Sequence, residues 1–263
     1  MWFISHPFFV VMYNMYQSFS DLYEKMYQTF INYDEEYIYY SGILKDYHHR
    51  SLVELGCGTG SLASHFIKEG YDYSGLDLSP EMLAIAQNKN PGSVFIPGDI
   101  RSFKLKEKTE SCIMPGRTIS YLLSNQEVVD CFNSIHENLK KEGIFCFDCI
   151  DAEKFIPTIN LGKQIRHEAE FNSKKFIRKS FWSRPDNESN LFKWKADFFE
   201  EHENGHLKKI GEDESILRTF SKNEIILFLK NCNFKVEKLD DRPSYAFETF
   251  VVVAQKNLDY GNV

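Results

Sequence analysis

The segment Val53-Glu54-Leu55-Gly56-Cys57-Gly58-Thr59-Gly60 indicates the fold of this 263-residue chain more clearly than any other stretch. It joins a short apolar run, Ser51 to Leu55, to a helix-like segment that begins at Ser61. Glycines at alternate positions let the backbone turn sharply and let a ligand approach without a Cβ in the way. A helix that starts directly after them points its N-terminal amides at that ligand. The segment therefore predicts a strand, a ligand-binding loop and a helix.

Strands and helices alternate along the chain after this loop. Ser79 and Pro80 are typical of a helix start, with the serine as cap and the proline in the first helical position. Another helix is expected from about Asn125 to Lys140. Such alternation is typical of an α/β protein with a Rossmann-like, doubly wound parallel sheet and helices on both faces. Apolar runs predict its further strands at Tyr71–Leu76, Val94–Ile96, Ser111–Met114 and Ile144–Ile150.

From about residue 165 to residue 220 the apolar period changes to two. Phe192, Trp194, Ala196 and Phe198 fall on one side of an extended segment, and Asn204-Gly205 is a strong hairpin signal. We expect an antiparallel insertion of three or four strands. Its tryptophans, Trp182 and Trp194, either form the core of the insertion or wall an acceptor pocket, and its basic cluster, 174–175 and 178–179, is expected on a solvated strand face.

The chain thus divides into four parts. Residues 1–50 form an aromatic, helical segment that either packs on the rest of the protein or acts as a lid. Residues 51–150 form the ligand-binding core, and residues 151–220 form the insertion, which we interpret as a substrate lobe. Residues 221–263 contain a last helix, which Ser221 caps, and a C-terminal hairpin that completes the core sheet.

Composition narrows the function classes. The formal net charge of −7 argues against nucleic acid or an anionic membrane as the main partner, because both usually require a basic face. No apolar stretch is long enough to span a bilayer, and the six cysteines lack the spacing of a disulfide framework. We therefore expect a cytoplasmic protein with reduced thiols. We also expect a monomer or homodimer with no bound metal.

Three carboxylates mark a candidate binding site. Asp77, at the end of the second strand, can accept two hydrogen bonds from a ribose diol, or it can serve only as a helix-entry residue. Asp99, in Gly98-Asp99-Ile100, can accept from an adenine amine while Ile100 covers the ring, or it can be a turn residue. Glu54 is placed to anchor the loop or a ligand ammonium.

These motifs, taken in order, resemble the S-adenosylmethionine-binding core of class I methyltransferases over residues 51–149. The resemblance implies S-adenosyl-L-methionine as cofactor and a seven-stranded sheet with one antiparallel strand. It places Gly56, Gly58 and Gly60 beside the methionine part of the cofactor, Asp77 at the ribose, and Asp99 with Ile100 at the adenine. Leu78 and Met82 belong to the second motif, Leu76 to Leu83, and are implied cofactor contacts as well.

A narrower resemblance begins at Met15-Tyr16 and continues through Phe19 to Glu24. It is to small-molecule methyltransferases that include sugar-amine N,N-dimethyltransferases, which also carry an antiparallel insertion before the last helix. It implies that Tyr23 lies near the reacting centre and Tyr33 near the cofactor carboxylate. Where those enzymes have a histidine after the fourth strand, this chain has Tyr121, and a phenol is a poor base at neutral pH.

The residues that would act on the acceptor are less clear than the cofactor site. Tyr23 and Tyr121 are candidates for orienting it, with core packing as the alternative for each. Arg117 follows the fourth strand and can grip a carboxylate or phosphate, or it can anchor its own loop. Cys146 and Cys149 would lie on opposite faces of one strand, so we interpret them as buried thiols.

We therefore predict a methyltransferase that acts on a small-molecule acceptor, with an amine as one candidate. RNA or protein acceptors and a non-catalytic cofactor-binding module remain alternatives. A nicotinamide-dependent dehydrogenase is the other class considered, but it would require glycine at position 61, where this chain has serine.

Overall fold

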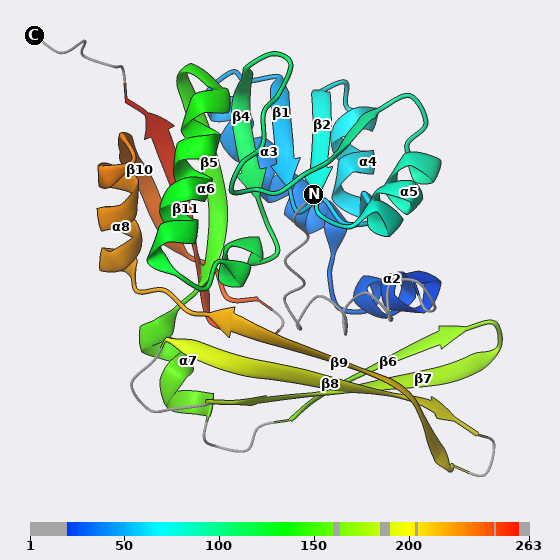
Figure 1. Cartoon of the computed structure of the whole chain (residues 1–263). Helices are drawn as coiled ribbons and strands as arrows, with labels where there is room; N and C mark the ends of the chain where they lie inside the picture. The colour runs from blue at the N-terminus through cyan, green and yellow to red at the C-terminus, as the bar shows by residue number, and fades with distance from the viewer. Residues whose placement is uncertain (1–19, 160–163, 185–189, 203–204, 245, 258–263) are drawn as a thin grey trace, which may run out of the picture. The chain divides into compact units, whose positions relative to one another are not determined.

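The computed structural model describes residues 20–159, 164–184, 190–202, 205–244 and 246–257, with side chains from Glu24 onward (Figure 1). The chain forms two compact units, which we describe separately. The larger unit comprises Tyr33–Glu153 and the chain from Arg218 on. The smaller comprises the described residues up to Asn32 together with Lys154–Leu217. The N-terminal motif from Met15 to Phe19 lies outside the described residues.

The larger unit contains a mixed sheet of seven strands in the order β10-β11-β5-β4-β1-β2-β3. Strand β11 pairs antiparallel with both β5 and β10, and the other neighbours pair in parallel, which confirms the predicted fold class. The bounds are β1 Ser51–Leu55, β2 Asp72–Asp77, β3 Val94–Pro97, β4 Thr109–Met114, β5 Leu139–Ile150, β10 Phe234–Asp241 and β11 Thr249–Lys256.

Helices α4, α5, α6 and α8 of this unit begin where the sequence predicts them. The Ser79 hydroxyl accepts from the Met82 N–H at 3.2 Å, and the Ser221 hydroxyl accepts from the Glu224 N–H at 3.2 Å. One expectation is wrong: α6 ends at Asn138, and β5 begins directly after it, because Leu139 pairs with Thr109 of β4. The bounds are α3 Tyr33–Asp46, α4 Ser61–Lys68, α5 Pro80–Lys89, η1 Thr118–Tyr121, α6 Asn125–Asn138 and α8 Lys222–Asn231.

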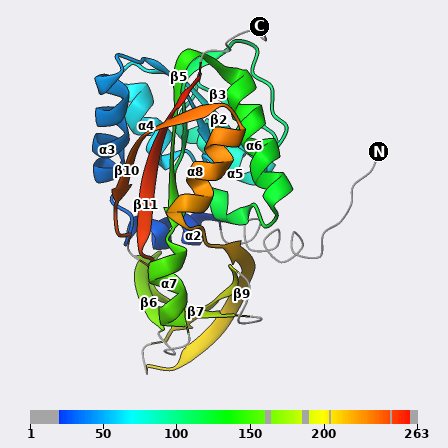
Figure 2. The ribbon, with the colours of Figure 1, turned by 90° about the vertical axis from the view of Figure 1, so that its left-hand side faces the viewer.

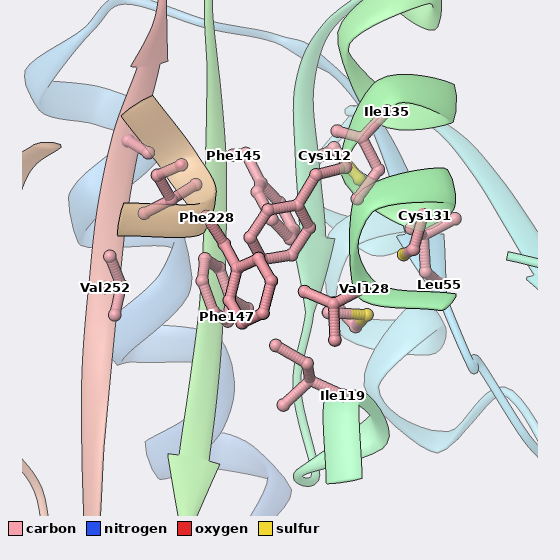
Figure 3. Close-up of a cluster of buried hydrophobic side chains, with 14 of the residues drawn as sticks. Leu55, Cys112, Ile119, Val128, Cys131, Ile135, Phe145, Phe147, Phe228 and Val252 are labelled. Carbon is pink, nitrogen blue, oxygen red and sulfur yellow. The ribbon is translucent and has the colours of Figure 1, made fainter. Parts of the chain in front are cut away.

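Helices cover both faces of the sheet, with α6 and α8 on one side and α3 and α4 on the other (Figure 2). The side chains of β5 show the cause, because Phe145, Phe147 and Cys149 belong to the cluster under α6 and α8. Ile144 and Cys146 belong to the cluster under α3 and α4. Figure 3 shows the first of these clusters, with both phenylalanines beside α6. The predicted placement of the two cysteines on opposite faces is confirmed.

The strand order reverses between β1 and β4. The chain runs from β1 outward to β2 and β3, then returns to form β4 on the other side of β1. Ligands of open α/β sheets bind outside the carboxyl ends of the strands at such a point. The loops after Leu55 and Met114 therefore frame the candidate site.

The smaller unit is an antiparallel sheet of four strands in the order β6-β7-β8-β9, which agrees with the expected insertion. Helix α2 packs on it through Met26, which contacts Ala169 and Phe176. Gly205, at the predicted hairpin, has a φ of +75°, and Asn204 lies outside the described residues. The bounds are α2 Ser20–Gln28, α7 Ala152–Ile159, β6 Ile165–Phe171, β7 Lys174–Ser183, β8 Leu191–Glu201 and β9 Leu207–Arg218.

One face of this small sheet carries ion pairs between strands. Lys175 pairs with Glu168 at 2.9 Å and with Glu201 at 3.0 Å. The basic cluster was expected on such a face, but for Arg178 that expectation is wrong. Arg178 is 3% exposed, because side chains alternate along β7 and this one turns to the opposite, buried face.

No helix within the described ranges has both the length and the apolar character that crossing a bilayer requires.

Candidate active site

The glycine-rich loop after β1 closes over the end of β2. The N–H groups of Gly56 and Cys57 donate to the carbonyl of Leu76, at 2.8 and 3.1 Å. Gly56 and Gly58 have φ values of +71° and +53°, in the left-handed region that glycine adopts without strain. The shape of the loop therefore depends on glycines at these two positions.

The loop has a closed side and an open side. A Cβ on Gly56 would lie 2.7 Å from the Thr118 side chain, whereas a Cβ on Gly58 would meet no atom within 4 Å. Gly60 serves close packing, because a Cβ there would lie 2.9 Å from Ala86 of α5. Gly60 also precedes α4 without a side-chain hydrogen bond to cap the helix. The open side at Gly58 and the amides at the start of α4 thus suit a ligand that carries a carboxylate.

Asp77 connects the glycine loop to the turn before α5. One carboxylate oxygen accepts from the Gly58 N–H and the other from the Ser79 N–H, each at 2.9 Å. Burial raises the pKa of this carboxyl, and the backbone hydrogen bonds oppose that shift. Each carboxylate oxygen can accept a second bond, so the helix-entry role and a bond to a ribose diol are compatible.

Asp99 lies after β3 in an ion-pair chain. Arg101 donates to both of its carboxylate oxygens, through Nε at 2.9 and 3.0 Å, and also donates to Glu127 at 2.5 Å. Burial alone would raise the pKa of Asp99, but the bonds from Arg101 lower it below its ordinary value. Ile100 packs against the core cluster under α6. Asp99 is therefore ionised and held in place by Arg101.

Glu54 is buried within the sheet at 3% exposure. It accepts a hydrogen bond from the Tyr73 hydroxyl at 2.6 Å. Burial raises the pKa of its carboxyl to about 8, partly opposed by the bond from Tyr73. Glu54 therefore anchors β1 to β2 as a neutral acid at pH 7, which supports the loop-anchoring role.

Replacement of Glu54 with glutamine tests this assignment through the pH dependence of stability. The pKa is about 8 in the folded protein and 4.5 for an unperturbed carboxyl, so the unfolded chain loses its proton first. The stability of the wild type therefore falls as pH rises from about 4.5 to about 8. We expect the Tm of Glu54→Gln minus that of the wild type to increase between pH 5 and pH 9, by an amount equivalent to a few kcal/mol.

Glu110 provides a matched control for that experiment. Its carboxylate accepts from the Arg50 and Ser51 N–H groups, at 2.8 and 3.0 Å, and the bond from Arg50 lowers its pKa to about 2. Glu110→Gln should therefore lose stability relative to the wild type at neutral pH and regain it toward pH 2. A pH-independent Tm difference for Glu54→Gln, measured by thermal denaturation, would contradict the buried neutral acid.

The turn after β4 lies against the glycine loop through Thr118. Arg117 precedes it with a φ of +61°, and its N–H donates to Asp148 at 2.8 Å. The Arg117 guanidinium donates to Ser244 at 2.9 Å and lies 5.1 Å from the ring centroid of Phe247. These contacts support the loop-anchoring role for Arg117. Tyr121 ends the same turn and is 47% exposed.

Asp148 is a candidate that the sequence interpretation missed. It lies near the carboxyl end of β5, is 7% exposed, and burial raises the pKa of its carboxyl to about 6. On the same face, Tyr40 of α3 is fully buried, and Glu36 of α3 binds Arg242 through two hydrogen bonds at 2.8 and 3.0 Å. In the sequence, the one feature that could have pointed to Asp148 is its carboxylate inside the apolar run Ile144–Ile150.

Known proteins resemble this chain in the same elements. Residues 52–143, which contain the glycine loop, Asp77, Asp99 and β4, match the family described as Methyltransferase domain. CalS10 from Micromonospora echinaspora, an amino pentose methyltransferase solved with S-adenosylmethionine bound, aligns with a TM-score of 0.77 and 18% identity, covering 90% of this chain and 97% of that one. The chain is an S-adenosylmethionine-dependent methyltransferase. Its cofactor is S-adenosylmethionine.

Two curated relatives align with different shares of this methyltransferase. "Putative methyltransferase YqeM" of Bacillus subtilis (strain 168) is 24% identical over 256 residues, which are 92% of this chain and 98% of that protein. The dTDP-3-amino-3,4,6-trideoxy-alpha-D-glucopyranose N,N-dimethyltransferase of Streptomyces venezuelae is 34% identical over 94 residues. That match spans 36% of this methyltransferase and 40% of the Streptomyces enzyme.

Other predicted residues of the methyltransferase have varied surroundings. Tyr33 begins α3 and packs against the core cluster under that helix. Leu78 is 48% exposed beside Asp77, whereas Met82 is 6% exposed in the first turn of α5. Tyr23 lies in α2, and its side chain is outside the described residues.

The small sheet of the methyltransferase also buries two charged side chains. The guanidinium carbon of Arg178 lies 5.0 Å from the ring centroids of both Tyr27 and Trp194. Asp213 is 3% exposed, and burial raises its pKa to about 6, against the charge of Arg178. Trp182 and Trp194 face each other as cross-strand partners and are 9% and 8% exposed, in agreement with a core role.

Proposed function

We propose that this methyltransferase transfers methyl groups to the amine nitrogen of a small molecule. The observation that carries the proposal is a pair of polar side chains at the edge of the sheet near the glycine loop. There the turn bearing Thr118 is bonded to the buried carboxylate of Asp148, and Tyr121 is exposed on the same turn. Carboxylates and phenols recognise ammonium and amine groups. Relatives whose names specify N,N-dimethylation of amino sugars add support.

We also propose roles for the residues on the cofactor side. Bound S-adenosylmethionine supplies a sulfonium methyl group, so the protein's part is to bind, orient and exclude water. Gly58 and the first turn of α4 would hold the methionine end, Asp77 would accept from the ribose, and Asp99 would accept from the adenine. The other proposed contacts are Tyr33, Gly56, Gly60, Leu78, Met82 and Ile100, whereas Glu54 supports the loop through its bond with Tyr73.

On the acceptor side, we propose that Tyr121 orients the acceptor by a hydrogen bond. Tyr23, which comes from the narrower sequence resemblance, is proposed to do the same from α2. Arg117 would keep the Thr118 turn against the glycine loop rather than bind the acceptor, because its guanidinium already contacts Ser244 and Phe247.

The proposal is tested first by calorimetry and then by an acceptor screen. S-adenosylmethionine and S-adenosylhomocysteine should each bind at micromolar concentrations, and NADH should not bind. Amino sugars, aliphatic amines, carboxylates, RNA and protein are then incubated with S-adenosylmethionine, and products are identified by mass. Methylated amines support the proposal, whereas methylation of only RNA, protein or carboxylates would replace it. Cofactor binding without turnover of any acceptor would favour a non-catalytic module.

Tyr121→Phe should reduce kcat for an amine acceptor while the affinity for S-adenosylmethionine stays within error. The loss should be roughly 3- to 10-fold, as expected for one hydrogen bond to the acceptor. Tyr121 is 47% exposed, so removal of its hydroxyl should leave the Tm unchanged. Tyr47→Phe, before β1 at the opposite edge of the sheet, is the matched control. Equal losses in kcat and cofactor affinity would instead place Tyr121 in the cofactor site.

All six cysteines are free and buried, which agrees with the proposed reducing, cytoplasmic location.

A further inference from the structure

An amine acceptor needs a group that takes its proton, because an ammonium ion has no lone pair for attack. We propose that Asp148 binds the acceptor as an ammonium ion and holds its proton while the free amine reacts. The inference rests on the proposed amine acceptor and adds a catalytic residue to it. Tyr121 is a phenol and cannot serve this role at neutral pH.

The backbone places Asp148 beside the turn that lies against the glycine loop. Its Oδ1 accepts from the Arg117 N–H at 2.8 Å, and the next residue, Thr118, lies where a Cβ on Gly56 would be only 2.7 Å away. Strands β4 and β5 are neighbours, with Met114 paired to Phe147, the residue before Asp148. The carboxylate is therefore one strand away from the switch point and at the same edge of the sheet.

The carboxylate keeps capacity for a second partner. Among the described residues, the Arg117 N–H is the one hydrogen-bond donor to Asp148, and the side chain retains 7% exposure. An ionised carboxyl group has about four lone-pair positions on two oxygens. Oδ2 can thus accept from an ammonium without breaking the bond that holds the turn.

Nearby groups keep this carboxylate ready to accept a proton near neutral pH. Burial and the charge of Glu36 raise its pKa, Arg117 and Arg242 lower it, and the result is about 6. Tyr40 stays a neutral phenol because burial raises its pKa, and its hydroxyl has no hydrogen-bond partner within the described ranges. The titratable and charged groups that act on Asp148 are Glu36, Tyr40, Arg117, Cys146, Cys149 and Arg242.

In the proposed step, proton transfer precedes methyl transfer. The N–H bond of the ammonium breaks, and the proton moves to an oxygen of Asp148. The nitrogen lone pair then forms a bond to the methyl carbon as the carbon–sulfur bond breaks, and sulfur keeps that electron pair. The methylated product leaves as an ammonium ion, and Asp148 releases its proton to water. A second methylation repeats the same sequence.

The test is the pH dependence of kcat/KM for wild type and Asp148→Asn with an amine that the wild type methylates. Wild-type activity should fall as pH drops through about 6, because a protonated Asp148 accepts no proton. At pH 7 the variant should be about 100-fold slower. Its deficit should shrink toward pH 10, where water alone deprotonates an amine. The variant retains a side-chain oxygen for the Arg117 N–H, so S-adenosylmethionine affinity should not change and the Tm should not fall.

A binding measurement without turnover separates this role from a structural one. The amine is titrated into the S-adenosylhomocysteine complex at pH 7, in two buffers of different ionisation enthalpy. With Asp148 present, the proton stays in the complex and almost none is released. Asp148→Asn must bind the free amine, so about one proton per amine should go to the buffer.

Asp151→Asn is the matched control, since Asp151 follows the same strand, is 2% exposed and accepts from the Glu153 N–H. It should leave the pH profile unchanged. A wild type that methylates amines with no acidic limb near pH 6, or an Asp148→Asn enzyme as fast as wild type at pH 7, would overturn the inference and leave the amine acceptor intact. A wild type that methylates no amine would remove the proposed function itself. If Asp148→Asn does not fold, the fall of wild-type kcat/KM as pH drops through about 6 still tests the inference.

Discussion

Gly56→Ala should lower the Tm of the methyltransferase by several degrees and eliminate measurable S-adenosylmethionine binding. Alanine at a φ of +71° is strained, and its Cβ would lie 2.7 Å from both Cγ2 and Oγ1 of Thr118. Thr118 cannot easily move, because its hydroxyl donates to the Pro115 carbonyl at 2.8 Å. Together these effects should cost roughly 2–4 kcal/mol of folding stability. Thermal denaturation and calorimetry measure both losses.

Gly58→Ala is the informative comparison for Gly56→Ala. Its φ of +53° is also strained for alanine, but its Cβ would meet no protein atom within 4 Å. The cost to stability should therefore be only about 1 kcal/mol. If the open side of the loop holds the cofactor, the same methyl group should weaken S-adenosylmethionine binding by at least about 10-fold. A Gly58→Ala protein with wild-type affinity would show that the cofactor lies elsewhere.

Asp77→Ala should weaken S-adenosylmethionine binding by roughly 10- to 100-fold, measured as Kd by calorimetry. The substitution removes the proposed bonds to the ribose, and it also leaves the N–H groups of Gly58 and Ser79 without their acceptor. The second effect loosens the loop that must hold the methionine end of the cofactor. Both effects act in the same direction, so the affinity loss should exceed that of one neutral hydrogen bond.

Asp72→Ala is the control for Asp77→Ala. Asp72 begins the same strand at the opposite edge of the sheet, and its side chain is exposed. Its removal should change neither Kd nor Tm. A folded Asp77→Ala protein with unchanged Kd would contradict the ribose assignment and leave Asp77 as a helix-entry residue alone.

The parts of the fold that depend on local chemistry could be predicted from the sequence. The strand Ser51–Leu55 has the predicted bounds, because an apolar run stops at an obligatory glycine turn. The helix starts at Pro80 and Lys222 follow from serine caps that act within three residues. In contrast, the start of β5 was wrong, because exposed charged residues there, Lys140 to Glu142, join the strand only through the pairing of Leu139 with Thr109.

The candidate site also has one part that local sequence predicts and one part that it does not. The glycine loop, Asp77 and Asp99 belong to short motifs whose function is visible in the order of residues. Asp148 is different, because its burial depends on α3, which precedes it by about a hundred positions, and its contact with the Arg117 turn depends on the pairing of β4 with β5. No spacing in the chain shows that contact.

The sequence by itself determined the α/β fold class, the cofactor loop and the antiparallel insertion, because periodicity, caps and glycine turns act over a few residues. The tertiary structure alone decided which polar side chains are buried. It turned Arg178 inward, made Glu54 a neutral anchor for Tyr73, and placed Asp148 against the Arg117 turn. The physical reason is that desolvation, and with it the protonation of a side chain, depends on everything packed around that side chain and not on its neighbours in the chain.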